Sequence, residues 1–239
     1  MRAIMWCENP ADLFRLATFV QTDPGHEKEA DAAYLFGHAR VCETPILDAG
    51  ADLHRECKVR LVAICKLAPG YPHNGTPDNP TYRDAPAWEN ELVDRGVNRK
   101  DIRMIESPRP AAGEEKFPVS HTGTEAERLV TLAKVSGWEA VFVVAHPMHM
   151  LRAFTQTVGF VLKEYPTLRV YAKTAAPKSW HAAALLNQGL TSGSPFMDGI
   201  DAEWKRLNAV YGNKYDPVPA AQVIEYINWR ESSRWATTE

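Results

Sequence analysis

Short, continuously apolar segments alternate with amphipathic segments along this chain, and this alternation limits its fold more than any other feature. The clearest apolar segment contains the run Val141-Phe142-Val143-Val144. A strand without polar alternation has to be buried on both faces, which is the environment of a parallel sheet covered by helices. The sequence therefore predicts an α/β fold, with a Rossmann-like parallel sheet of about five strands, helices on both faces and a helical C-terminal tail.

The predicted strands and helices follow each other in regular order. The strands are expected at 31–36, 59–65, 102–105, 139–145 and 168–172, and the helices from 44 onward and at 87–95, 124–136, 147–162 and 201–230. Thr44 and Pro45 suit the cap and first turn of a helix, and Thr124 with Glu127 has capping-box spacing. We expect a single α/β domain over 1–239, with its core at about 31–172 and a helical extension at about 200–231.

Composition and charge exclude several classes of function. The net charge of −3 argues against a nucleic-acid partner and against a polybasic membrane patch. The chain has no apolar run long enough to span a bilayer, its first twenty residues lack signal-peptide features, and its four cysteines form no C-x-x-C pair. We therefore expect a cytoplasmic protein with reduced, mostly buried thiols.

Ligands of open parallel sheets bind outside the carboxyl ends of the strands. The first predicted strand ends at Gly37-His38-Ala39-Arg40 and the second near Gly70, so Gly37, His38, Arg40 and Gly70 are candidate ligand contacts. Eight of the 17 prolines lie between 69 and 118, in loops expected at 69–86 and 107–121, and they predict a rigid rim around this edge. No G-x-G-x-x-G, G-x-S-x-G or Walker motif is present, so the usual NAD, serine-hydrolase and NTPase sites have no support.

The segment after the fourth predicted strand has the strongest chemical character. His149 and Arg152 are three residues apart and share a face at the start of a helix. A cation is disfavoured at a helix N-terminus, so Arg152 indicates an anion or carboxylate shared with His149. The alternative is a surface arginine paired with a nearby glutamate. His146 and His149 could also ligate a metal, but no ligand signature completes such a site, and we predict no metal.

Acidic and hydroxyl side chains supply the other candidates. Thr122 and Glu125 open the helix before the fourth strand, and Glu89 lies near the start of its own helix. Glu125 could cap its helix, or it could project into the crevice and hold a ligand amine or hydroxyl. We take His149, Arg152 and Glu125 as candidate catalytic residues. The candidate cofactor-binding residues are Gly37, His38, Arg40, Gly70, Glu89, Thr122 and His146.

At these residues the sequence resembles the YdcF/SanA/ElyC-like family, a Rossmann-like domain of unknown function. The best match is 149–153, His-Met-Leu-Arg-Ala, and further matches lie at 35–37, 89–97 with Ile102, and 122–126. The resemblance covers roughly 31–172 in the family's order. It implies a crevice lined by Gly37, Glu89, Glu125, His149 and Arg152. Because bacterial members are linked to S-adenosylmethionine binding and to envelope maintenance, it also implies S-adenosylmethionine as a cofactor.

The sequence departs from the family pattern at four points. Ala68-Pro69-Gly70 and a long insert replace the family's Ser-Gly-Gly, and His146 and Ala126 replace a hydroxyl residue and an asparagine. The membrane anchor of some members has no counterpart in this sequence.

Three functions remain open on the sequence. The first is a small-molecule enzyme or binder for an anionic or zwitterionic ligand of the nucleotide or S-adenosylmethionine type. The second is a hydrolase for a phosphorylated or envelope-related substrate, with His146, His149 and Arg152 at the reacting group. The third is a non-catalytic interaction protein that uses Trp204, Trp229 and Trp235, although such aromatics also suit core packing or a homodimer contact. The sequence does not separate a transferase from a hydrolase.

Overall fold

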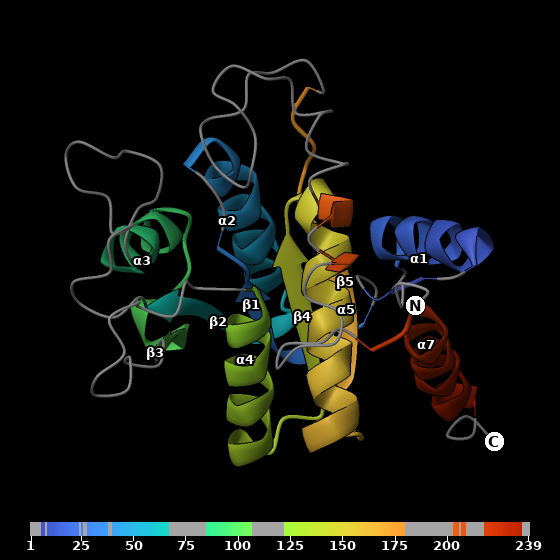
Figure 1. The fold of residues 1–239 in the computed structure, drawn as a ribbon. Coiled ribbons are helices and arrows are strands. Elements are labelled where there is room, and N and C mark those ends of the chain that lie inside the picture. Colours follow the sequence, from blue (N-terminus) through green and yellow to red (C-terminus); the bar gives the residue numbers. More distant parts are fainter. Residues whose placement is uncertain are drawn as a thin grey trace, which may run out of the picture.

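Five parallel strands form one sheet in the order β3-β2-β1-β4-β5, as Figure 1 shows. A computed structural model describes residues 6–7, 9–23, 25, 28–37, 40–66, 85–106, 122–179, 203–205, 207–208 and 218–235. The strands are β1 (Ala30–Leu35), β2 (Val59–Lys66), β3 (Ile102–Glu106), β4 (Ala140–Ala145) and β5 (Arg169–Thr174). The predicted α/β, Rossmann-like parallel sheet is confirmed, and each predicted strand is found within two residues of its expected bounds.

Helices cover both faces of the sheet. They are α1 (Pro10–Thr22), α2 (Arg40–Arg55), α3 (Ala85–Asp94), α4 (Thr122–Ser136), α5 (Pro147–Glu164) and α7 (Ala220–Trp235), with the 3₁₀ turn η2 at Arg99–Asp101. One buried cluster joins the sheet to α2 and α3, and the other joins it to α1, α4, α5 and α7. Figure 1 shows α4 and α5 side by side in front of the sheet.

The centre of the sheet is apolar on both faces. Every residue of β4 is buried, and Phe142 packs against α2 on one face while Val143 packs toward α4 and α5 on the other. Residues adjacent in a strand point to opposite faces, so a run such as 141–144 has an apolar side chain for each cluster. The uninterrupted hydrophobicity of this segment is thus explained by its central place between two helical layers.

Three sequence-based helix boundaries are wrong. Helix α2 begins at Arg40 rather than at Thr44, and Pro45 lies inside it. Helix α4 begins at Thr122, so Thr124 lies within the first turn and does not cap it. Helix α3 begins at Ala85, which takes the last two residues from the loop expected at 69–86. In each case the helix continues N-terminally because its earlier residues pack into the protein: Cys42, Ala85 and Thr122 are buried.

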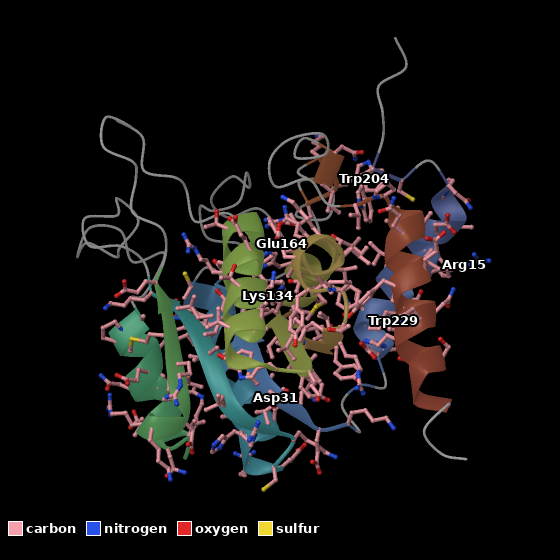
Figure 2. All side chains as sticks on the ribbon, turned by 90° about the horizontal axis from the view of Figure 1, so that it is seen from below. Arg15, Asp31, Lys134, Glu164, Trp204 and Trp229 are labelled. Carbon is pink, nitrogen blue, oxygen red and sulfur yellow. The ribbon has the colours of Figure 1, made fainter. Side chains whose placement is uncertain are left out.

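Helix α1 is the element that the sequence reading did not include. Asn9 caps it by accepting a hydrogen bond from the Ala11 N–H, and Pro10 occupies its first turn. Figure 2 shows α1 beside α7 at the β5 end of the sheet, with Arg15 and Trp229 on these two helices. Trp204, which precedes α7 in the chain, packs against Trp6 in an edge-to-face contact. Trp204 therefore takes part in the protein's own packing.

The four cysteines are free thiols, as predicted. Cys7 and Cys42 are buried, Cys65 is partly buried and Cys57 is exposed. Burial raises the pKa of Cys42 to about 12, with the charges of Lys178 and Glu43 acting in opposite directions. This thiol therefore stays protonated at neutral pH. No helix among the described residues combines the length and the hydrophobicity that crossing a membrane requires.

Candidate functional site

The topological switch point of the sheet lies between the neighbouring strands β1 and β4. Helix α2, which follows β1, packs on one face of the sheet, while α5, which follows β4, packs on the other. At such a switch point the connections diverge and leave a crevice beyond the strand ends. Gly37 follows β1 and His146 follows β4, so both lie at this edge. The first turns of α4 and α5 lie beside it, because Thr122 and His149 are in contact.

Glu125 ties the first turn of α4 to the end of β1. Its Oε2 accepts hydrogen bonds from the Gly37 N–H at 3.2 Å and from the Tyr34 hydroxyl at 3.3 Å. Burial and the negative charge of Glu125 raise the pKa of Tyr34 well above its ordinary value, so Tyr34 remains a proton donor. The hydrogen bonds that Glu125 accepts thus hold the backbone after β1.

Thr122 is the partner of His149. The Thr122 Oγ1 and the His149 Nε2 are 2.8 Å apart, and both residues are almost completely buried. The imidazole also lies edge-to-face against Phe36, with ring centroids 5.9 Å apart. Thr122 and Phe36 therefore hold His149 from two different segments of the chain.

Arg152 is paired with a carboxylate of the chain itself. Its Nε and Nη2 donate to the two carboxylate oxygens of Glu203 at 2.6 and 3.2 Å, and its Nη1 donates to the Thr122 Oγ1. The side chains of Arg152 and Glu203 are only 11% and 10% exposed. The sequence alone leaves two alternatives for Arg152, an anion shared with His149 or a surface pair with a glutamate. The pair exists, but it is largely shielded from solvent and joined to Thr122.

His146 occupies the N-cap position of α5 and is 3% exposed. Burial lowers the pKa of His146 to about 4, and the positive charge of Lys178 acts in the same direction. The imidazole is therefore neutral at physiological pH. Lys178 was not among the candidate residues, and it lies near both His146 and Cys42.

The buried His146 predicts a pH dependence of stability. The unfolded chain takes up this proton near its ordinary pKa of 6.5 and the folded chain only near 4, so its contribution to stability is complete above 6.5 and is lost as the pH falls. Between these values the wild type should lose up to about 3 kcal/mol that His146→Gln does not lose. Urea denaturation of both proteins across this range measures the difference. Parallel pH profiles would contradict the prediction.

Not every predicted residue is brought to this edge. Glu89 pairs with Arg99 at 2.5 Å, and Arg99 belongs to the turn that precedes β3 at the opposite end of the strand. Glu89 is therefore engaged away from the carboxyl ends. The backbone of Arg40 begins α2, but its side chain is not described. His38, Gly70, most of the loop at 69–86 and the whole loop at 107–121 lie outside the described residues.

A threonine hydroxyl is buried in the first turn of α4, at this edge. The Thr124 Oγ1, in the first turn of α4, is buried and makes no hydrogen bond to any described residue. A buried hydroxyl without a partner costs free energy. A ligand hydroxyl, carboxylate or phosphate oxygen would satisfy it, beside the free N–H groups that a helix N-terminus presents. This observation is compatible with a nucleotide or with the amino-acid end of S-adenosylmethionine.

Glu203 is not among the candidate residues from the sequence, and neither are Tyr34 and Thr124. Glu203 lies 51 residues after Arg152 in the helical C-terminal region, where nothing in the local pattern connects it to the strand ends. Neither a protein-family model nor a curated protein sequence matches this chain.

Proposed function

We propose that this protein binds a small anionic or zwitterionic ligand beyond the ends of β1 and β4, and that it acts on or with this ligand as an enzyme. A nucleotide or S-adenosylmethionine is the leading candidate. The observation that carries the proposal is the convergence of Gly37, Thr122, Glu125 and His149 at the switch point of a parallel sheet. These residues come from three separate connections and are joined by hydrogen bonds.

The arrangement supports a distinct role for each group. Gly37 lets a ligand approach the backbone after β1, and Glu125 holds that backbone in place. Thr124 offers a hydroxyl to a ligand oxygen. His149 donates a hydrogen bond or transfers a proton, since an imidazole has a suitable intrinsic pKa. Arg152 acts through Thr122, because its guanidinium is held by Glu203.

Membership of the YdcF/SanA/ElyC-like family is part of the same proposal. It is supported by the Rossmann-like strand order and by the meeting of the family-like segments at 35–37, 122–126 and 149–153. S-adenosylmethionine, when bound, would supply a transferable methyl group. Thr124 and the first turn of α4 would then hold its polar end, and Gly37 would lie beside it.

A glycine substitution separates binding from folding. A β-carbon at Gly37 would lie 3.4 Å from the Glu125 Oε1, which is an ordinary contact, and the backbone there does not need glycine. Gly37→Ala should therefore leave the free energy of unfolding within about 1 kcal/mol of the wild-type value. It should weaken ligand binding at least about tenfold, because the methyl group blocks the approach to the backbone. Calorimetric titration with S-adenosylmethionine, AMP and ATP measures the binding.

A matched control is Gly96→Ala, in the turn between α3 and η2, which precedes β3 and lies away from the carboxyl ends of the strands. Gly96 has a φ of 91°, so alanine there should lower stability without affecting binding. If the wild type binds none of the three compounds, the ligand class proposed here is wrong. If Gly37→Ala binds as tightly as the wild type, the ligand does not lie against the backbone after β1.

A further inference from the structure

We propose that Glu203 is a positioning residue for His149: through Arg152 and Thr122 it keeps the imidazole proton on Nδ1 and leaves Nε2 as an acceptor. The four side chains form one hydrogen-bonded chain that starts in the C-terminal segment and ends in the first turn of α5. The relevance of this tautomer to a ligand rests on the proposed function. The chain of contacts itself does not.

The first link fixes the guanidinium. Glu203 accepts hydrogen bonds from both Nε and Nη2 of Arg152, at 2.6 and 3.2 Å. One edge of the planar guanidinium is therefore held by the carboxylate. A two-point contact with a carboxylate restricts the orientation of arginine more than a single hydrogen bond does. The remaining nitrogen, Nη1, is thereby directed at the Thr122 Oγ1.

The second link decides the direction of the Thr122 hydroxyl. A guanidinium can only donate, so the Thr122 Oγ1 is the acceptor in its contact with Arg152. Accepting from a cation polarises a hydroxyl and makes it a better donor of its own proton. The His149 Nε2, at 2.8 Å, is the partner placed to accept that proton.

The third link determines which ring nitrogen of His149 carries the proton. If Nε2 accepts from Thr122, a neutral imidazole carries its proton on Nδ1. His149 would then meet the ligand with an Nδ1–H donor, whereas the other tautomer would present an acceptor there. Glu203 acts on this choice through its hydrogen bonds to Arg152.

Nitrogen NMR of the full chain without ligand tests the proposal, because protonated and unprotonated ring nitrogens have well-separated shifts. The sequence has eight histidines, and the His149 signals can be assigned by their loss in His149→Gln. In the wild type, the His149 Nε2 should give an unprotonated-nitrogen signal. In Glu203→Ala it should shift toward the protonated position, as the two tautomers become mixed. Glu225→Gln, at an exposed position of α7, is the matched control and should leave the spectrum unchanged.

Glu203→Gln provides the second variant, because the amide keeps the size of the side chain and removes its charge. Circular dichroism identifies which variants are folded. A shift of the Nε2 signal in either folded variant supports the proposal. An unchanged signal in every folded variant overturns it, and so does a protonated Nε2 in the wild type. Since no ligand is added, a failed titration with nucleotides or S-adenosylmethionine would refute the proposed function and leave this result standing.

Discussion

Replacing Arg230 with alanine is expected to lower the free energy of unfolding by roughly 3–5 kcal/mol, the cost of removing one partner of a buried ion pair. Nη1 and Nη2 of Arg230 donate to the two carboxylate oxygens of Asp23 at 2.9 and 3.0 Å. Neither side chain has any exposed surface. Without the guanidinium, Asp23 would be a buried carboxylate that has lost its counter-charge.

The same arginine protects an edge of the sheet. Strand β5 is an outer strand, and its outward-facing backbone groups are paired by side chains from α7 and from the end of α1. Arg230 donates to the Val170 carbonyl at 2.5 Å, and the Tyr226 hydroxyl accepts from the Val170 N–H at 2.7 Å. Asp23 accepts from the Ala172 N–H at 2.8 Å. Exposed strand edges promote edge-to-edge association, so loss of Arg230 should also increase aggregation.

Urea denaturation followed by circular dichroism measures the loss of stability, and light scattering measures aggregation. Arg15→Ala is the control, since the Arg15 side chain is 70% exposed and only pairs with Asp12 one turn away. It should change stability by less than about 0.5 kcal/mol. If Arg230→Ala cost no more than this control, the buried pair would not hold α7 against β5.

Trp6→Ala is expected to have an effect of similar size, about 3–5 kcal/mol, because it removes a large, fully buried side chain. Trp6 is 1% exposed, and its ring lies edge-to-face against Trp204 with centroids 6.2 Å apart. Its indole N–H donates to the Val218 carbonyl at 3.0 Å. The residue thus joins the beginning of the chain to two parts of the C-terminal region.

The substitution should also affect the candidate site. Glu203 directly precedes Trp204, so loosening the contact with Trp6 weakens the hold on Arg152. Trypsin cleavage after the exposed Lys205 should accelerate in Trp6→Ala. Trp229→Ala, at a side chain that is 38% exposed, is the matched control and should cost about 1 kcal/mol or less. Equal stability and equal cleavage rates in the two variants would show that Trp6 does not secure this segment.

Much of the fold could be predicted because its signals are local. Each strand is a short apolar run, and the run at 141–144 required burial on both faces, which only the centre of a covered parallel sheet provides. Helix α1 also has a local signal, since Asn9 and Pro10 are residue types that suit a helix start. The helix starts at Thr44 and Thr124 failed because tertiary packing extends α2 and α4 beyond a residue that suits a cap.

The candidate site was predicted in part for a similar reason. Gly37, Thr122, Glu125, His146 and His149 each follow a strand or open a helix, and the carboxyl ends of parallel strands meet at one edge whatever the details of packing. Their pairing was not predictable. Glu125 holds Gly37 and Tyr34, and Glu89 pairs with Arg99 away from this edge.

By itself, the sequence determined the parallel α/β architecture and the edge at which polar residues gather, because periodicity and strand ends are properties of neighbouring residues. Only the tertiary structure decided which charges meet. Arg152 pairs with Glu203, 51 residues away in the sequence, and Arg230 pairs with Asp23, 207 residues away. Nothing in the local sequence of either arginine indicates its partner. The physical reason is that burial excludes water from these groups, so each charge must be satisfied by whichever opposite charge the packed elements bring within reach.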